Sequence, residues 1–255
     1  MVRRAHAHRD HVVRFGQLVP SWHLLKMVVF SDAGWATRAS GHSQCGGLHF
    51  TTAPGALKGE SAPCCLIDTQ CQQITWKTGN AHEAETHAAI MNLRTAELHQ
   101  FTYYELSHYD VVSVSRFLGL STGERIFMAL VVDNRGLFTQ VDIQKLEKKP
   151  GIYVFQLFGT VERLGAHFYW VNGGHMLADP LTKLPDRCLD TIPAMLDALS
   201  SGRLRIAYDT ESWKRMISKK SGQIHELAVP KAGIVTADPN DVVGKTFPQC
   251  LPTDT

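Results

Sequence analysis

Four acidic residues stand near the ends of predicted strands or helices, where carboxylates can do chemistry. Asp32 follows the apolar run at residues 27–30, and Asp133 follows a second apolar run that ends at residue 132. Glu85 and Asp179 lie early in two predicted helices. A carboxylate beside a buried strand is costly unless it is paired or holds a cation.

Each of these acids also has an ordinary structural explanation, because aspartates cap turns and acids in the first turns stabilise helix dipoles. Taken together, four acids at element ends in one domain favour a shared metal site. A ligand set made only of oxygen atoms suits Mg²⁺ or Mn²⁺ and does not suit zinc.

The first half of the chain predicts three strands and two helices. Residues 27–30, four apolar residues in a row, predict a strand buried on both faces. Two further strands, joined to it by short connections, suggest an antiparallel meander. The remaining predicted elements are a second strand at 44–52, an inserted loop at 53–70, a third strand at 71–77, a helix at 81–99 capped by Asn80, and a helix at 101–120.

The second half of the chain predicts two more strands, and the sheet is therefore mixed. The predicted elements are a strand ending at 132, a helix at 137–149, a helix at 154–164, a strand at 165–171, a short helix from 175 and a helix at 186–200, with a further helix at 211–218 and a flexible tail from 219. Strand ends are where α/β folds build their sites. His175, four residues before Asp179, is either an assistant in proton transfer or product release, or a surface turn residue.

The composition is that of an ordinary globular protein, with 255 residues, 44% hydrophobic and 20% charged. No apolar run reaches transmembrane length, and no apolar segment follows the charged N-terminus, so we expect no membrane span and no secretory signal. The spacing of the six cysteines fits no zinc motif, which favours reduced thiols and an intracellular location, in the cytoplasm or the nucleus.

The net charge of +2 is unevenly distributed along the chain. Residues 1–26 carry five basic side chains against one acidic, and residues 27–185 carry 12 basic against 14 acidic. The first segment is either a solvated, partly helical arm or an arm that attracts phosphates. An acidic middle segment still admits a nucleic-acid partner if its carboxylates hold divalent cations.

Six short motifs make residues 27–185 resemble the ribonuclease H domain of copia-type LTR retrotransposon polyproteins. They are Ser31-Asp32-Ala33-Gly34-Trp35-Ala36, Ser40-Gly41, Ile74-Thr75-Trp76, Glu83-Ala84-Glu85-Thr86, Asp133-Asn134 and Ala178-Asp179-Pro180-Leu181-Thr182-Lys183. The resemblance implies an α/β ribonuclease H-like fold, with a five-stranded mixed sheet whose first three strands are antiparallel, flanked by helices. Thr86 departs from the family's usual tyrosine, and the family's Lys-His-Ile-Asp helix is not recognisable in residues 148–164.

The family's catalytic acids correspond to Asp32, Glu85, Asp133 and Asp179. Glu85 matches the family's helix register better than Glu83 does. The resemblance implies that these acids hold two Mg²⁺ or Mn²⁺ ions, about 4 Å apart, which activate water against an RNA phosphodiester. Asp32, on the central strand, is expected to bridge both ions. The implied substrate is an RNA–DNA hybrid, in which 2′-hydroxyls mark the RNA strand.

The resemblance also implies a domain organisation and two rival functions. We expect a basic arm at 1–26, a ribonuclease H-like domain at 27–185 and a helical extension with a flexible tail at 186–255. A reverse transcriptase domain is the expected partner, and the chain resembles a fragment or remnant of such an element. The rivals are a degenerate domain that binds nucleic acid without cleavage and an integrase-type core, which the antiparallel first strands and the Asp-Asn pair fit poorly.

Overall fold

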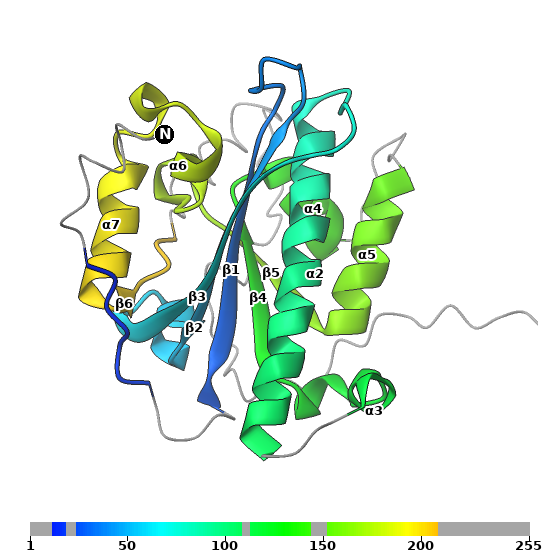
Figure 1. Cartoon of the computed structure of the whole chain (residues 1–255), viewed down its shortest axis with the longest axis vertical. Helices are drawn as coiled ribbons and strands as arrows, with labels where there is room; N and C mark the ends of the chain where they lie inside the picture. The colour runs from blue at the N-terminus through cyan, green and yellow to red at the C-terminus, as the bar shows by residue number, and fades with distance from the viewer. Residues whose placement is uncertain (1–11, 19–23, 109–112, 144–151, 209–255) are drawn as a thin grey trace, which may run out of the picture.

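The computed structural model describes residues 12–18, 24–108, 113–143 and 152–208 (Figure 1). The elements in chain order are β1 (Lys26–Gly34), β2 (Gln44–Thr52), η2 (Pro54–Lys58), β3 (Ala62–Gln73), α2 (Ala81–His108), α3 (Val114–Leu118), η3 (Thr122–Glu124), β4 (Phe127–Val132), α4 (Arg135–Ile143), α5 (Ile152–Leu164), β5 (Ala166–Trp170), η4 (Gly173–His175), α6 (Asp179–Thr182), η5 (Pro185–Arg187), α7 (Thr191–Ser201) and β6 (Arg203–Leu204).

The strands form one mixed sheet with the order β5-β4-β1-β2-β3-β6. β1, β2 and β3 are antiparallel neighbours, whereas β4 pairs parallel to β1 and β5 pairs parallel to β4. The predicted ribonuclease H-like architecture, with three antiparallel strands first, is therefore confirmed. The sheet has six strands where five were predicted, because the short β6 pairs with the start of β3.

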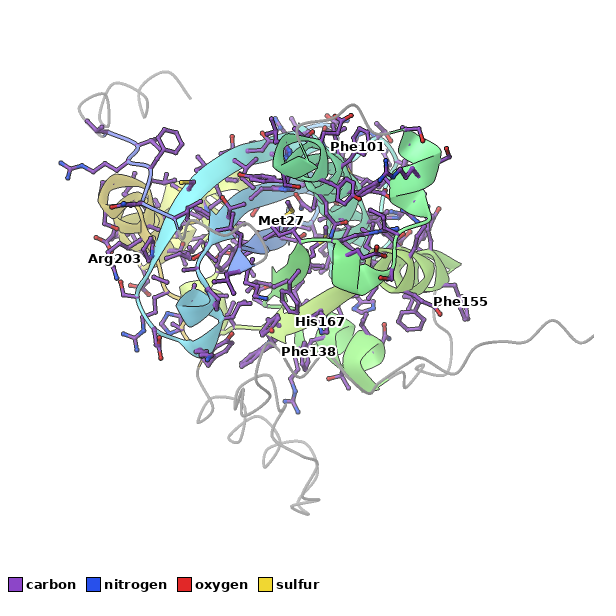
Figure 2. The ribbon with its side chains drawn as sticks, turned by 90° about the horizontal axis from the view of Figure 1, so that it is seen from below. Met27, Phe101, Phe138, Phe155, His167 and Arg203 are labelled. Atoms are coloured by element: carbon purple, nitrogen blue, oxygen red, sulfur yellow. The ribbon has the colours of Figure 1, made fainter. Side chains whose placement is uncertain are left out.

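Helices cover both faces of the sheet (Figure 1). α2, α4 and α5 lie on one side, and α6 and α7 lie on the other. Each face of the sheet carries a hydrophobic core. Alternate residues of β1 contribute to one core and then the other, since successive side chains of a strand point to opposite faces. Met27 and Val29 pack toward the α2 side, and Val28 and Phe30 pack toward the α6 side. Seen from below, Met27 lies in the middle of the molecule (Figure 2).

Two neighbouring glycines of β2 let helices approach the sheet closely on opposite faces. A Cβ at Gly46 would lie 2.5 Å from Cγ2 of Thr182 in α6. A Cβ at Gly47 would overlap the side chain of Asn92 in α2. A larger residue at Gly46 would press against α6, and a larger residue at Gly47 would displace the side-chain amide of Asn92.

Two predicted boundaries are wrong. Residues 53–70 are not an inserted loop and the third strand does not occupy 71–77, because β3 runs from Ala62 to Gln73. Pro63 is tolerated near the start of this strand, since only its carbonyl is needed there and accepts from the N–H of Ala53 at 3.2 Å. The helices predicted at 81–99 and 101–120 are instead one long α2 that ends at His108, followed by the short α3.

The flanking segments contact the sheet where they are described. The N–H of Arg14 donates to Leu199 O at 2.8 Å, and the N–H of Gly16 donates to Cys64 O at 2.7 Å. α7 begins five residues after the start of the helix predicted at 186–200, and it contributes Ala198 to the core. The domain boundaries at 26 and 185 stay predictions, and the predicted helix at 211–218 and the tail lie outside the described residues.

None of the helices in the described ranges combines the length and the apolar character needed to cross a bilayer. The five cysteines in these ranges are free, and their sulfurs form no disulfide.

Candidate metal centre

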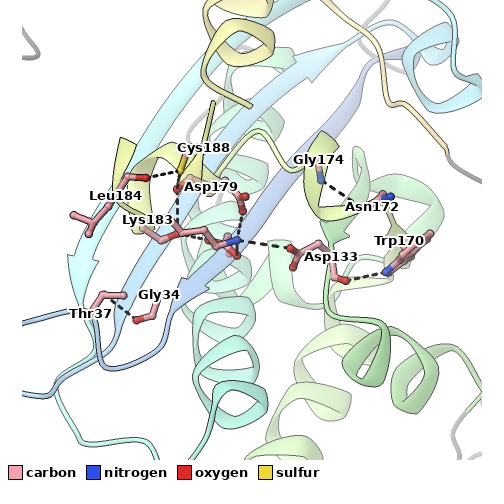
Figure 3. A network of polar contacts seen from close by, with 12 residues as sticks. Gly34, Thr37, Asp133, Trp170, Asn172, Gly174, Asp179, Lys183, Leu184 and Cys188 are labelled. Atoms are coloured by element: carbon pink, nitrogen blue, oxygen red, sulfur yellow. Dashed lines mark hydrogen bonds and ion pairs between the residues drawn. The ribbon is translucent and has the colours of Figure 1, made fainter. Parts of the chain in front are cut away.

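Three aspartates from three different elements converge at one end of the central strands. Asp32 lies in β1, Asp133 directly follows β4, and Asp179 is the first residue of α6. One carboxylate oxygen of each lies within 4.8 Å of the others (Figure 3). We call these three residues the aspartate cluster.

The sheet register brings Asp32 and Asp133 together. β1 and β4 are parallel, with Phe30 opposite Val131, and two more residues along each strand lead to the two aspartates. β1 continues to Gly34, so Asp32 lies inside the strand. The sequence pattern had placed it after the end of the strand. Asp32 shares its face with Val28 and Phe30, the face that α6 covers.

α6 adds the third aspartate from this face. The hydroxyl of Thr182 donates to Oδ2 of Asp32, which joins the short helix directly to β1. The N–H of Asp179 donates to Met176 O at 3.1 Å, and Met176 is fully buried. Asp179 is therefore fixed against the sheet although α6 is only one turn long.

Glu85 approaches the cluster from α2. It is buried and accepts a hydrogen bond from the backbone N–H of Ala33, the residue after Asp32. It does not belong to the group of three whose oxygens lie within 4.8 Å. Glu83, the alternative acid of the same motif, instead accepts from the N–H of Gly79 at 2.7 Å and so caps the region before α2.

Two buried carboxylate oxygens accept no hydrogen bond in the described structure: Oε2 of Glu85, and Oδ1 of Asp32, which has the ammonium of Lys183 at 3.5 Å. Such atoms are costly in a protein interior unless a cation compensates them. The oxygen-only donor set matches what Mg²⁺ and Mn²⁺ prefer. By both criteria the residues present fit a divalent cation.

Burial and mutual repulsion disfavour the charged form of these acids. Burial, with repulsion from Asp32, raises the pKa of Asp133 to about 6 and that of Asp179 to about 7. Burial also raises the pKa of Glu85 well above its usual value, with further contributions from Asp32 and Asp133. A nearby cation would reverse these shifts, since it favours the ionised carboxylates.

Lys183 is a site residue to which the sequence pattern gave no role. Its Nζ lies 2.5 Å from Oδ1 of Asp179, 3.5 Å from Oδ1 of Asp32 and 3.9 Å from Oδ2 of Asp133. The signal was present in the sequence, because Lys183 is four residues after Asp179, one helical turn away on the same side.

Asn92 of α2 supports the site from behind β1. Its Nδ2 donates to Oγ of Ser31 at 2.9 Å and to Gly46 O at 3.0 Å. Its Oδ1 lies 3.2 Å from Nε2 of His49, so one amide joins α2 to both β1 and β2. Sequence reasoning also missed this residue, since a lone Asn inside a helix carries no distinctive pattern.

The loop after β5 borders Asp133. The indole N–H of Trp170 donates to the backbone carbonyl of Asp133 at 2.8 Å, and a Cβ at Gly173 would lie 3.3 Å from Oδ2 of Asp133. His175, at the end of η4, is exposed. Its predicted role in proton transfer or product release stays a prediction.

No protein-family model matches the chain, and no curated protein matches it. Similar solved structures are RNase H domains. The N-terminal RNase H domain of a Mycobacterium tuberculosis protein, fused to maltose binding protein, is 16% identical with a TM-score of 0.37, and the match covers 67% of this chain and 98% of that one. RNase H1 from Halobacterium salinarum is 16% identical with a TM-score of 0.38, covering 65% and 98%.

A third similar structure is LC11-RNase H1, described as in complex with an RNA/DNA hybrid. It is 16% identical with a TM-score of 0.39, and the match covers 62% of this chain and 94% of that one. Identities this low identify no site residue of the present chain.

Proposed function

We propose that residues 27–185 form a ribonuclease H that hydrolyses the RNA strand of RNA–DNA hybrids with the help of divalent metal ions. The observation that carries this proposal is the convergence of Asp32, Asp133 and Asp179, from three separate elements, within 4.8 Å of one another. Four motifs of the copia-type pattern supply the aspartates and Glu85, in the order that this pattern expects.

Each acid has a distinct part in the proposal. Asp32, Asp133 and Asp179 would hold the cations, and Asp32 lies on β1, a central strand between β4 and β2. Glu85 would complete the set of metal ligands from α2, through its Oε2 atom, which accepts no hydrogen bond in the described structure. When bound, a pair of Mg²⁺ or Mn²⁺ ions would supply activation of a water molecule and stabilisation of the leaving oxygen.

The protein itself contributes negative charge and the fixed positions of the carboxylates. Thr182 fixes the Asp32 carboxylate through its hydroxyl, and Gly46 lets α6 approach closely enough for that contact. The acids are held by strand register and helix packing, on rigid elements and not on long loops, which keeps their oxygens preorganised.

A degenerate domain that binds nucleic acid without cutting it is the second candidate. One observation favours it: the ammonium of Lys183 already lies among the aspartates and neutralises part of their charge. A domain that had lost its metal ions would need such a compensation. The presence of all four acids favours the active enzyme.

The cellular context is part of the same proposal. The motifs resemble copia-type elements, so we propose a retrotransposon origin, a reverse transcriptase domain as partner and an intracellular site of action. Co-purification of the chain with a reverse transcriptase domain of such an element tests the partnership.

The direct test is cleavage of a hybrid that carries a label on its RNA strand. The wild-type chain should cut the RNA strand in Mg²⁺ and not in EDTA, and should leave duplex DNA of the same sequence intact. Asp32→Asn should lower the rate by more than about 100-fold, because loss of a metal ligand costs at least as much as loss of a residue that supports one. Asp197→Asn, on the exposed side of α7, is the matched control and should cleave at the wild-type rate.

The outcomes separate the candidates. Hybrid binding without cleavage by the wild-type chain would favour the degenerate domain. Full activity in Asp32→Asn would remove Asp32 from the active site.

A further inference from the structure

The ammonium of Lys183 occupies the space that the aspartate cluster encloses (Figure 3). Its Nζ lies 2.5, 3.5 and 3.9 Å from oxygens of Asp179, Asp32 and Asp133. In the described ranges, every ion pair formed by these three aspartates is with Lys183. One monovalent cation therefore contacts all three residues proposed to hold divalent ions.

We propose that Lys183 is a resident counter-cation, which a divalent metal ion must displace before it can bind the aspartate cluster. This inference rests on the proposed metal-dependent function. The ammonium of Lys183 then competes with the metal ion: it stabilises the aspartate cluster in the absence of metal, and it weakens the affinity of the cluster for metal.

The balance of charges supports a resident cation. Three aspartates and Glu85 meet in a buried region, and repulsion among them is severe without positive charge. A single ammonium compensates only part of four carboxylates. The site therefore keeps an attraction for a divalent ion while it is held together by the lysine.

The backbone geometry allows the side chain to leave. α6 ends at Thr182, and Lys183 follows in an extended conformation with φ −110° and ψ 163°. Its N–H donates to Asp179 O at 2.9 Å, so the backbone stays attached to α6. The Lys183 side chain is 28% exposed and has a flexible four-carbon stem, so its ammonium can turn to solvent while α6 remains in place.

Displacement has a thermodynamic consequence. An ammonium and a divalent ion cannot both occupy the centre of the cluster, so the metal binds only molecules in which Lys183 has moved out. The apparent dissociation constant then equals the intrinsic one divided by the fraction of molecules with the lysine displaced. Removing the ammonium removes this factor.

The test is calorimetric titration of Mg²⁺ into the full chain at pH 8, for the wild type, Lys183→Met, Lys183→Arg and Lys58→Met. Lys183→Met should bind Mg²⁺ about tenfold more tightly than the wild type, and Lys183→Arg, which keeps the charge, should stay near the wild type. In EDTA, the thermal midpoint of Lys183→Met should fall below that of the wild type. Lys58, beyond the far end of β2, is the control for the loss of one positive charge and should change nothing.

The results distinguish this inference from the proposed function. Equal or weaker Mg²⁺ binding by Lys183→Met, with binding by the wild type intact, overturns the resident counter-cation and leaves the metal site standing. Absence of Mg²⁺ binding by every protein overturns the metal site itself, and this inference with it.

A measurement on the wild-type chain guards against misfolding of the methionine variant. In ¹H–¹⁵N spectra of lysine side chains, the Nζ signal absent from Lys183→Arg identifies Lys183. Addition of Mg²⁺ should move this signal toward that of a solvent-exposed lysine. A signal unchanged at saturating Mg²⁺ would show that metal and ammonium do not compete.

Discussion

The site residues carry opposing tendencies that a cation reconciles. Burial and mutual repulsion raise the pKa values of Asp133 and Asp179 to about 6 and about 7, so both carboxyls are hard to ionise in the metal-free fold. Metal binding needs them ionised. The affinity for Mg²⁺ should therefore increase as the pH rises from 6 to 8.

The same pKa shifts predict how the metal-free protein responds to pH. A carboxyl whose pKa is raised by folding contributes stability at pH values below its unfolded pKa, and this contribution is lost as the pH rises through its folded pKa. The wild-type chain in EDTA should therefore lose stability between about pH 4 and pH 7.

Replacement of Asp133 by Asn should reduce the loss of stability that the metal-free protein shows as the pH rises. At pH 8 in EDTA, Asp133→Asn should be more stable than the wild type by roughly 1–3 kcal/mol, because a neutral amide replaces a buried charge. Near pH 4 the difference should shrink, since the wild-type carboxyl is then protonated. Urea unfolding at the two pH values measures both numbers, and a wild type more stable than Asp133→Asn at pH 8 would contradict the account.

At this scale the sequence predicted the acids and missed their partners. Asp32 and Asp133 are recognisable because each ends an apolar run, which is a local pattern. The contacts of Lys183 with two other elements, and of Asn92 with two strands, depend on the register between distant segments. No local pattern reports that register.

At the scale of elements, the site depends on how closely α6 approaches β2. Opposite Asp32 in β2 stands Gly46, and a Cβ there would lie 2.5 Å from Cγ2 of Thr182, 3.1 Å from Cβ of Leu181 and 3.3 Å from Ala178 O. Because Gly46 has no side chain, α6 fills the space that a Cβ atom would take. Thr182, which holds Asp32, and Asp179 both belong to this turn.

The substitution Gly46→Ala should therefore separate α6 from the sheet. We expect it to weaken Mg²⁺ binding by about 10-fold or more, as loss of a supporting contact does in metal sites, while the fold is retained. The control is Gly159→Ala in α5, where nothing lies within 4 Å of the added methyl group and where stability should rise slightly. Wild-type Mg²⁺ affinity in Gly46→Ala would show that the close approach is not required.

The predicted elements succeeded where the hydrophobic pattern was strong and failed where tertiary pairing decides. β1 and β4 were predicted from continuous apolar runs, and both are central strands. Residues 62–70 have mixed polarity and contain Pro63, yet residues 64–70 pair with residues 47–52 of β2. Their strand conformation comes from that partner and not from their own sequence.

At the scale of the whole molecule, the sheet separates two cores and joins them at the site. The core on the α2 side contains Met27 and Leu93, and the core on the α6 side contains Phe30 and Met176. Glu85 comes from the first side and Asp179 from the second, with Asp32 between them in the sheet. The site thus depends on the correct packing of both layers, which explains why no single segment contains it.

We infer that these acids gather to hold divalent metal ions. The most direct test of this inference is an anomalous difference map from crystals of the full chain soaked in Mn²⁺. We expect at least one strong peak bounded by the carboxylates of Asp32, Asp133 and Asp179, with the Lys183 ammonium moved away. A map without a peak there, in which Lys183 still contacts the three aspartates at saturating Mn²⁺, would contradict it.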